Sequence, residues 1–287
     1  MKLLLFGKTG QVAREIARRV PVGIELMALD RAAADLSNPE ACAAILRKTE
    51  ADAVINAAAY TAVDKAEDEA ALAQVINGDA PGAMARAAAE RALPFVHIST
   101  DYVFDGLVEQ PFTPDRATGP ASVYGRSKRS GEEQVAAAGG AYAILRTSWV
   151  FSVHGANFVK TMLKVGAGRD SLTVVADQIG GPTPASHIAD AVLSMAVQLK
   201  DHPEKSGIYH FSGVPDTSWA GFARAVFETA GMNTEVKDIP TSAWPTPAAR
   251  PLNSRMDCTS LSDVFGIGRP DWRAALVSVV QDLQKES

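Results

Sequence analysis

Short apolar segments alternate with helical patterns through the first 150 residues, and this alternation constrains the fold more than any other feature. The pattern predicts strands over residues 2–6, 24–29, 53–57, 94–99 and 141–146. These segments are nearly continuous apolar runs, which is typical of strands buried on both faces of a parallel sheet. Strands that alternate with helices predict an α/β fold, with a doubly wound parallel sheet covered by helices on both faces.

Composition and charge narrow the functional classes. The chain has 287 residues, of which 47% are hydrophobic and 21% are charged, as in an ordinary globular protein of more than one domain. Its net charge of −5 argues against nucleic-acid binding, which usually needs a basic surplus. Two cysteines exclude a disulfide framework and suit a reducing compartment. No apolar run reaches the length of a signal peptide or membrane span, so we expect a cytoplasmic protein.

The second half of the chain is less regular. Strands are predicted over residues 172–175, 207–211 and 235–239, and helices over residues 186–199, 218–231 and 272–285. Four prolines between residues 240 and 251 predict an extended loop. We therefore expect a first domain over residues 1–148. A smaller α/β domain should come mainly from residues 149–287, with some segments returning to the first.

A glycine-containing turn follows the first predicted strand and opens the first helix. Gly7 permits a tight turn, and Gly10 lets the backbone approach a pyrophosphate at the helix N-terminus. Ala13 replaces the third glycine of the dinucleotide-binding pattern, and glycines after strands are common for other reasons. The position between a strand and a helix nevertheless favours a Rossmann-type domain that binds NAD(P).

The end of the second predicted strand carries two opposed signals for the cofactor. Asp30 follows the turn at about the 20 residues expected of an acid that binds the adenosine ribose, which favours NADH. Arg31 can instead hold a 2′-phosphate, which favours NADPH, so both cofactors stay open. Asp35 and Leu36 can flank the adenine, and the small residues Ala57, Ala58 and Ala59 allow the backbone to approach the cofactor closely. The candidate cofactor site therefore comprises Gly7, Gly10, Gln11, Val12, Asp30, Arg31, Asp35, Leu36, Ala57, Ala58 and Ala59.

Three side chains form a candidate catalytic group. Tyr124 and Lys128 are four residues apart, on one face of a predicted helix. A phenol is a poor acid or base at neutral pH, but a nearby ammonium stabilises its phenolate and lowers its pKa. Such a pair alone is usually an ordinary helix surface. Here Thr100 stands at the carboxyl end of the fourth predicted strand, where doubly wound sheets bind ligands.

Together, the glycine turn, the hydroxyl at a strand end and Tyr124-x-x-x-Lys128 resemble the extended short-chain dehydrogenase/reductase family. Nucleotide-sugar dehydratases of that family have an Asp-Glu pair after the hydroxyl. Asp101-Tyr102 stands there in this chain, which argues against dehydration. Segments along the whole chain resemble the dTDP-4-dehydrorhamnose reductases of the family: residues 56–67, 99–106, 146–150, 177–183, 249–254 and 270–273.

The resemblance implies a reaction and three catalytic roles. Such enzymes reduce the C4 keto group of dTDP-4-dehydro-L-rhamnose to give dTDP-L-rhamnose, with hydride from NADPH or NADH. Tyr124 would protonate the developing alkoxide, and Thr100 would orient the carbonyl. Lys128 would lower the pKa of the tyrosine and bind the nicotinamide ribose.

The substrate side is expected to involve residues from both halves of the chain. The resemblance implies that Val63, Asp101 and Trp149 lie beside the sugar, together with Thr100 and Tyr124. Arginines suit a diphosphate because the guanidinium presents a planar fork of donors. The further candidates for binding the dTDP-sugar are Asn157, Arg250, Asn253 and Arg255.

Metal binding and assembly are left open by the sequence. Some family members bind Mg²⁺ through acids at a dimer contact, but Asp190, between two alanines, cannot be matched to those acids. We therefore assign no metal ligand and leave Mg²⁺ and a homodimer open. His97, His187 and His210 lack metal-site spacing and are predicted to be structural or surface residues.

Three rival functions remain at this point, and the first is another nucleotide-sugar reductase of the same family. A nucleotide-sugar epimerase would hold its NAD tightly and would not exchange it with solvent. A regulatory subunit would bind NADP and a partner enzyme without catalysis, although the presence of Thr100, Tyr124 and Lys128 weighs against it.

Overall fold

The computed structural model describes residues 1–285 and is built around one six-stranded parallel sheet. Its strand order is β2-β1-β3-β4-β5-β10. The strands are β1 (Lys2–Phe6), β2 (Glu25–Leu29), β3 (Ala53–Asn56), β4 (Phe95–Thr100), β5 (Tyr142–Thr147) and β10 (Gly207–Phe211). The order reverses between β1 and β3, which places a ligand-binding crevice at the carboxyl ends of these strands.

The predicted strands of the first half all belong to this sheet. Their observed ends differ from the predicted ends by one residue or coincide with them. The apolar runs explain the outcome, since alternate side chains of each strand enter different helical layers. In β1, Leu3 and Leu5 pack in one core cluster, while Leu4 and Phe6 pack in the other.

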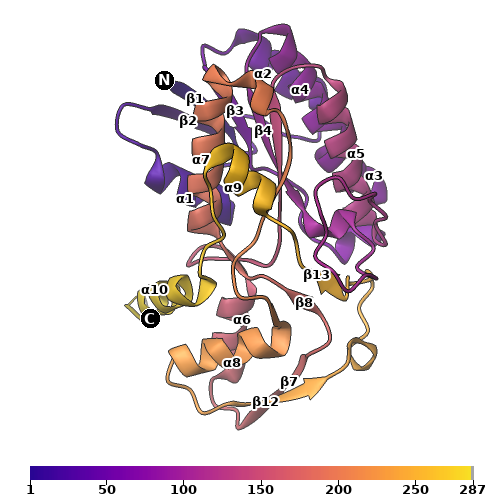
Figure 1. The fold of residues 1–287 in the computed structure, drawn as a ribbon, viewed down its shortest axis with the longest axis vertical. Helices are drawn as coiled ribbons and strands as arrows, with labels where there is room; N and C mark the ends of the chain where they lie inside the picture. The colour runs from indigo at the N-terminus through magenta and orange to yellow at the C-terminus, as the bar shows by residue number, and fades with distance from the viewer. Residues whose placement is uncertain (286–287) are drawn as a thin grey trace.

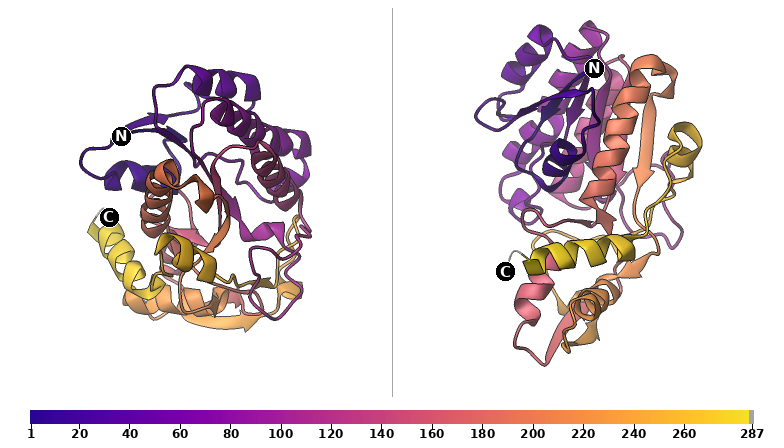
Figure 2. Two further views of the ribbon diagram at one scale, coloured as in Figure 1. Left: turned by 45° about the horizontal axis from the view of Figure 1, so that its top comes forward. Right: turned by 90° about the vertical axis from the view of Figure 1, so that its left-hand side faces the viewer.

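Helices cover both faces of the sheet, which confirms the doubly wound fold (Figures 1 and 2). One layer contains α2 (Pro39–Lys48), α4 (Ala80–Glu90) and α5 (Val123–Ala137). The other contains α1 (Gln11–Arg19), α7 (Ala185–Asp201) and α9 (Thr259–Phe265). Thus β10, α7 and α9 return from the second half of the chain to the first sheet.

Local signals set where these helices begin. The Asn38 side chain caps α2 by accepting from Ala41 N at 3.1 Å, and Pro39 occupies the first turn, as the sequence predicts. Ser122 likewise caps α5. The segment between β3 and β4 is less regular than expected. It contains a 3-10 turn (Lys65–Glu67), α3 (Ala70–Gln74) and a π-helical turn (Val75–Asp79) that leads into α4.

A smaller unit from the second half of the chain lies below the sheet in Figure 1. Its helices are α6 (Phe158–Gly166), α8 (Trp219–Thr229) and α10 (Trp272–Lys285), and they enclose a core that includes Phe151, Phe222 and Trp272. Its paired strands are β7 (Ser171–Val175) with β12 (Glu235–Ile239), β6 (Val150–Phe151) with β9 (Thr183–Pro184), and β8 (Ile179–Gly180) with β11 (Thr217–Ser218) and β13 (Asn253–Ser254).

One loop prediction needs correction. The proline-rich segment 240–251 is not extended throughout, because Thr241–Ala243 form a 3-10 turn. The Asp177 carboxylate accepts from the Thr241 backbone N–H and hydroxyl, and these bonds hold the turn against the strand region before β8. Among residues 1–285, no helix has the length and apolar character that crossing a membrane requires.

Candidate active site

A cavity of about 460 Å³ lies at the carboxyl ends of β1, β2 and β3. Nine of the eleven residues predicted around the glycine turn and strand ends line it: Gly7, Gly10, Asp30, Arg31, Asp35, Leu36, Ala57, Ala58 and Ala59. The other two lie elsewhere. The side-chain Oε1 of Gln11 accepts hydrogen bonds from Ser152 and Asn157, and Val12 packs against the core.

The two glycines have different physical tasks in this cavity. Gly7 has φ of +100°, and a Cβ there would stand 3.2 Å from the backbone nitrogen of Ala58. Both facts favour glycine at the turn. Gly10 precedes α1, and no atom lies within 4 Å of where its Cβ would stand. Because Thr9 and Gly10 line the cavity, the N-terminus of α1 opens onto it, and an anionic group can be held there.

Charged side chains surround the outer part of this cavity. Lys8 Nζ lies 3.9 Å from Asp30 Oδ2, and Arg31 Nε lies 3.4 Å from Asp35 Oδ2. The side chain of Arg31 is 78% exposed, so it is free to turn toward a ligand. Two acidic and two basic side chains thus meet where the sequence left the choice between NADH and NADPH open.

Thr100 and Tyr124 meet at the carboxyl end of β4. The Thr100 hydroxyl is buried, accepts from Tyr102 N at 3.2 Å and donates to Asp101 Oδ1 at 3.0 Å. Burial raises the pKa of Tyr124 to about 12, while hydrogen bonding to Thr100 opposes the rise. The phenol is therefore fully protonated at neutral pH and able to act as an acid.

Lys128 differs from the arrangement that the sequence suggested. Its side chain is buried, and its Nζ donates to the carbonyl oxygen of Ile98 at 2.7 Å and lies 3.2 Å from His97 Nε2. The groups that shift the pKa of Tyr124 are its buried surroundings, Thr100 and Asp101. Since β4 holds the lysine nitrogen here, the lowering of the Tyr124 pKa by Lys128 stays a prediction.

Asp101 contributes a buried carboxyl group to the same region. Burial raises its pKa to about 6, and the neighbouring hydroxyls of Ser254 and Thr100 oppose that rise. Among the described residues, no hydrogen-bond partner is found for its Oδ2 atom. A buried oxygen without a partner is costly, so this atom is a candidate acceptor for a ligand hydroxyl.

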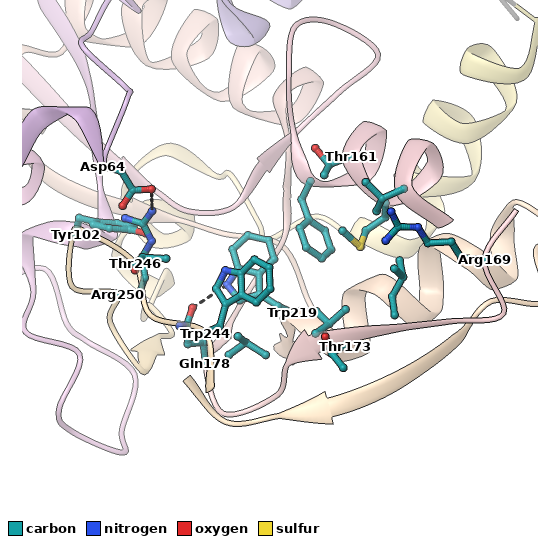
Figure 3. Close-up of a pocket in the computed structure, with 16 residues that line it drawn as sticks. Asp64, Tyr102, Thr161, Arg169, Thr173, Gln178, Trp219, Trp244, Thr246 and Arg250 are labelled. Atoms are coloured by element: carbon teal, nitrogen blue, oxygen red, sulfur yellow. Dashed lines mark hydrogen bonds and ion pairs between the residues drawn. The ribbon is translucent and has the colours of Figure 1, made fainter. Parts of the chain in front are cut away.

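A second cavity, of about 570 Å³, lies between α6, β7 and the loop before β13 (Figure 3). Aromatic residues Phe158, Trp219 and Trp244 line it. At the other end, Arg250 Nη2 donates to Asp64 Oδ2 at 2.7 Å, and the guanidinium lies over the Tyr102 ring. The cavity therefore offers flat apolar surfaces and two cations, Arg250 at this end and Arg169 beside α6.

Trp149 reaches this aromatic group from the end of β5. Its ring stacks on Trp219, with centroids 3.7 Å apart and planes at 13°. Its φ is +48°, which is unusual for a residue other than glycine, and a Cβ on Gly180 would approach its ring to 2.9 Å. A strained backbone held by surrounding contacts is typical of functional sites.

The remaining predicted substrate residues make contacts within the protein. Asn157 caps α6 and donates to Ser152 O at 2.8 Å, and Asn253 donates to Val108 O at 2.7 Å. Arg255 donates to Asn253 Oδ1 and to the Glu109 carbonyl. These contacts give a structural reason for all three side chains. Val63 is half-buried, next to Asp64 of the second cavity.

The family model for the RmlD substrate binding domain matches residues 1–285. This chain belongs to that family. A dTDP-4-dehydrorhamnose reductase from Sinorhizobium fredii is 43% identical, over 100% of this chain and 99% of its own length.

Two solved structures extend the comparison. A dTDP-4-dehydrorhamnose reductase from Clostridium acetobutylicum is 35% identical with a TM-score of 0.92, covering 99% of this chain and 100% of its own. One from Bacillus anthracis, in complex with NADP, is 31% identical with a TM-score of 0.90, covering 98% and 99%.

In this member of the RmlD substrate binding domain family, one loop borders both cavities. Residues 57–62 and Lys65 line the first cavity, and Asp64 lines the second. The rings of Tyr102 and Tyr124 meet edge to face at 5.5 Å, which joins the second cavity to the Thr100–Tyr124 pair. The chemistry implied by the catalytic residues can therefore occur where the two cavities approach.

Several lining residues were missed by the sequence analysis. Lys8 and Thr9 stand inside the glycine turn and could have been found from that motif. Tyr102, Trp219 and Trp244 carry no sequence signal for the second cavity, because three distant segments bring them there.

Asp190 does not fit a metal site. Both of its carboxylate oxygens accept from Arg19, at 2.7 Å each. Across residues 1–285, no group of three or more His, Cys, Asp or Glu side chains is placed to hold a metal ion. We therefore derive no step through Mg²⁺.

Proposed function

We propose that this chain reduces the C4 keto group of dTDP-4-dehydro-L-rhamnose to dTDP-L-rhamnose, with NADPH or NADH. The pairing of Thr100 with Tyr124 at the carboxyl end of β4 carries the proposal, since the Tyr124 ring contacts Tyr102, which lines the second cavity. The proteins that the chain resembles support it, since the relatives compared above are named dTDP-4-dehydrorhamnose reductases.

The first cavity is proposed to hold the cofactor. The N–H groups at the start of α1 face the pyrophosphate, while Gly7 and Ala57–Ala59 let the backbone approach closely. Lys8, Asp30 and Arg31 surround the adenosine ribose, and affinities for NADPH and NADH would measure the preference. When bound, the cofactor supplies the hydride. The Bacillus anthracis relative in complex with NADP supports this assignment.

Thr100 and Tyr124 are proposed to act on the carbonyl oxygen. The Thr100 hydroxyl rotates away from Asp101 Oδ1 and donates the hydrogen bond that orients the C4 carbonyl. The phenol of Tyr124 transfers its proton to the C4 oxygen as that oxygen gains negative charge. A pKa of about 12 keeps the acid loaded at neutral pH. Lys128 lies one helical turn after Tyr124 and is proposed to face the nicotinamide ribose.

The second cavity is proposed to hold the dTDP part of the substrate. Aromatic faces suit a base, and Arg250 suits the diphosphate. On this assignment residues 1–148 form the cofactor domain, and residues 149–287 supply most of the substrate domain. Asp101 and Trp149 would then lie beside the sugar.

The Tyr124→Phe variant tests the proposal. It should keep the wild-type affinity for NADPH and lose at least about 100-fold in kcat, because it lacks only the acid. Loss of NADPH absorbance with dTDP-4-dehydro-L-rhamnose measures turnover. Tyr142→Phe, at the opposite end of the sheet, is the control and should keep its activity. A near-normal kcat in Tyr124→Phe would show that Tyr124 is not the acid. A wild-type protein without turnover would refute the proposed function.

Experiments on the purified protein distinguish the proposed reductase from an epimerase and from a regulatory subunit. An epimerase would retain NAD through purification, which absorbance and mass spectrometry detect. A regulatory subunit would bind NADP yet leave the substrate unchanged. A cytoplasmic location and a homodimer stay predictions, for cell fractionation and analytical ultracentrifugation respectively.

A further inference from the structure

A buried polar chain runs from β3 through β4 to α5, behind Lys128. Asn56 and His97 are both 0% exposed, and Lys128 is 1% exposed. Asn56 and His97 have no role in the proposed reaction, although burying polar groups is costly unless each makes its hydrogen bonds. Their contacts explain how the lysine is held.

The protons of this chain can be placed from its hydrogen bonds. Ala58 N donates to Asn56 Oδ1 at 3.2 Å, which fixes the orientation of the side-chain amide. Asn56 Nδ2 then faces His97 Nδ1 at 3.1 Å and donates to it. A neutral imidazole carries one proton, so that proton is on Nε2. Burial and the nearby Lys128 both lower the pKa of His97, which keeps the ring neutral.

The Nε2–H group of His97 points at the lysine nitrogen. The two nitrogens are 3.2 Å apart, while Lys128 Nζ donates to Ile98 O. An ammonium has no lone pair, so it would meet the Nε2–H donor to donor. An amine has one lone pair and accepts this hydrogen bond. The network therefore stabilises the amine form of Lys128 relative to the ammonium form.

The charges around Lys128 do not cancel this preference. Burial lowers the pKa of Lys128 to about 8, and the Glu132 carboxylate on the same helix opposes that shift. Glu132 is itself paired with Arg146 of β5, at 2.6 Å. The other titratable neighbours, His97 from β4 and Tyr124 one turn earlier, are neutral at pH 7.

We propose that His97 is a positioning residue for Lys128: its Nε2–H holds the lysine nitrogen against β4 and favours the amine over the ammonium. The catalytic consequence rests on the proposed function. Tyr124 gives up a proton in each turnover and must regain one. The Lys128 ammonium can supply this proton when its nitrogen leaves the Ile98 carbonyl and turns toward the Tyr124 oxygen, and the transfer converts the phenolate back to phenol. The resulting amine accepts the His97 hydrogen bond until it takes a proton from solvent.

Nitrogen NMR of [¹⁵N]histidine-labelled, cofactor-free protein tests the proton placement directly. The ring shifts distinguish Nε2–H from Nδ1–H, and His97→Asn assigns the His97 signals. At about pH 9, above the pKa of Lys128, we expect His97 as the Nε2–H form. If His97 is in the Nδ1–H form at that pH, the proposal is overturned. This measurement is made on the wild-type protein.

Titration of Lys128 tests the energetic part. Carbon NMR of [¹³C]lysine-labelled protein, assigned with Lys128→Met, should give a wild-type pKa well below the ordinary lysine value. His97→Asn keeps a partner for Asn56 but withdraws the Nε2–H, so the proton affinity of Lys128 should rise about tenfold, for one lost hydrogen bond. Asn56→Asp requires Nδ1–H on His97 and should raise that affinity at least as much.

Ser127→Ala is the matched control. Ser127 is also buried on α5 and accepts from Asn77 Nδ2 at 3.0 Å, so the variant loses a buried hydrogen bond without touching the His97 contact. Its lysine titration should match the wild type. An unchanged pKa of Lys128 in both His97→Asn and Asn56→Asp would overturn the proposal. If His97→Asn does not fold, the lysine titration of Asn56→Asp and the histidine spectra of the wild type test the proposal instead.

Kinetics connect the network to turnover. If the ammonium form is required, kcat/KM should fall above the pKa of Lys128, and His97→Asn should move this basic limb to higher pH. If the basic limb of kcat/KM lies at the same pH in His97→Asn as in the wild type, the proposed catalytic consequence is contradicted. A wild-type protein that does not reduce the substrate would refute the proposed function, while the two NMR measurements still judge the role of His97.

Discussion

At the scale of single residues, burial sets the chemistry more than the identity of the side chain does. Asp101, Tyr124 and Lys128 all have shifted pKa values because each is removed from water. The shifts favour the neutral form in every case. A site with a neutral phenol and a weakly basic lysine suits a reaction in which one proton moves to an uncharged carbonyl.

Asp101→Asn should change the pH dependence of substrate binding. In the wild type the carboxyl group ionises near pH 6, so an acceptor for sugar hydroxyls gains charge above that pH and loses it below. We expect KM for the sugar substrate to rise as pH falls through 6, and Asp101→Asn to lack this dependence. KM should also rise by about 10-fold or more, since hydrogen bonds to charged groups contribute about 1.5–3 kcal/mol.

Asp105→Asn on the neighbouring loop provides the comparison for the pH profiles, because its carboxylate accepts from the nearby backbone N–H of Leu107, at 3.0 Å. A wild-type profile that is flat through pH 6 would exclude Asp101 as the titrating acceptor.

Arg250→Met should weaken substrate binding and spare cofactor binding. Among the described residues, Arg250 Nη1 is buried without a hydrogen-bond partner, while Nη2 is paired with Asp64. A diphosphate oxygen would satisfy the free donor by a charge-assisted bond. We expect KM for the nucleotide sugar to rise about 10- to 100-fold, with the NADPH affinity unchanged.

Arg224→Met removes another paired arginine, whose 2.6 Å contact with Asp238 is exposed, and should leave KM unchanged. Equal effects of the two substitutions would mean that Arg250 acts through general charge or stability rather than through the substrate.

At the scale of elements, the start of α5 determines where Tyr124 points. Ser122 caps the helix through Gly125 N at 3.1 Å. Gly125 packs so closely that a Cβ there would stand 2.2 Å from the Tyr102 carbonyl oxygen. The helix start is therefore pressed against the 3-10 turn that follows β4 (Asp101–Val103), and this contact brings the acid to Thr100.

Gly125→Ala should disable the acid more than it destabilises the protein. The added methyl must push α5 away from Tyr102, and overpacking of this kind costs about 1–3 kcal/mol. A displacement of about 1 Å at the adjacent Tyr124 can reduce kcat about 100-fold. Gly140→Ala makes a milder contact after the end of α5, where Cβ would lie 2.8 Å from Ala89 Cβ.

The comparison of kcat with melting temperature separates position from stability. Both alanine variants should melt at lower temperature than the wild type, but Gly140→Ala should keep most of its kcat. If kcat falls in proportion to melting temperature in both Gly125→Ala and Gly140→Ala, the position of α5 does not limit the reaction.

At the scale of the whole molecule, a buried junction joins the two halves of the chain. His210 lies on β10, which returns from the second half, and its Nε2 is 3.3 Å from Arg146 Nη1 of β5. Its Nδ1 is 3.1 Å from the Phe112 carbonyl. Burial, and then Arg146, lower the pKa of His210 to about 3.

Stability should therefore fall in mild acid. An unfolded histidine takes up a proton near pH 6.5, whereas the folded ring resists until about pH 3, so stability is lost as pH falls through this window. Between pH 7 and 5, His210 should account for about 2 kcal/mol of the decrease in the free energy of unfolding. Urea unfolding at the two pH values measures that decrease, which should be smaller in His210→Asn. His202→Asn, at an exposed position, should behave like the wild type.

The sequence by itself determined the features that depend on neighbours along the chain. Apolar runs and caps predicted the sheet and the helix starts, because these are local. The glycine turn, Thr100 and the Tyr124–Lys128 pair were placed because strand ends and helix spacing set their positions. Only the tertiary structure decided the contacts of distant segments: Trp149 on Trp219, Arg250 with Asp64, and His97 against Lys128. It also gave Asn157, Asn253 and Arg255 partners within the protein. Burial and pairing depend on how separate elements pack, which a local pattern does not specify.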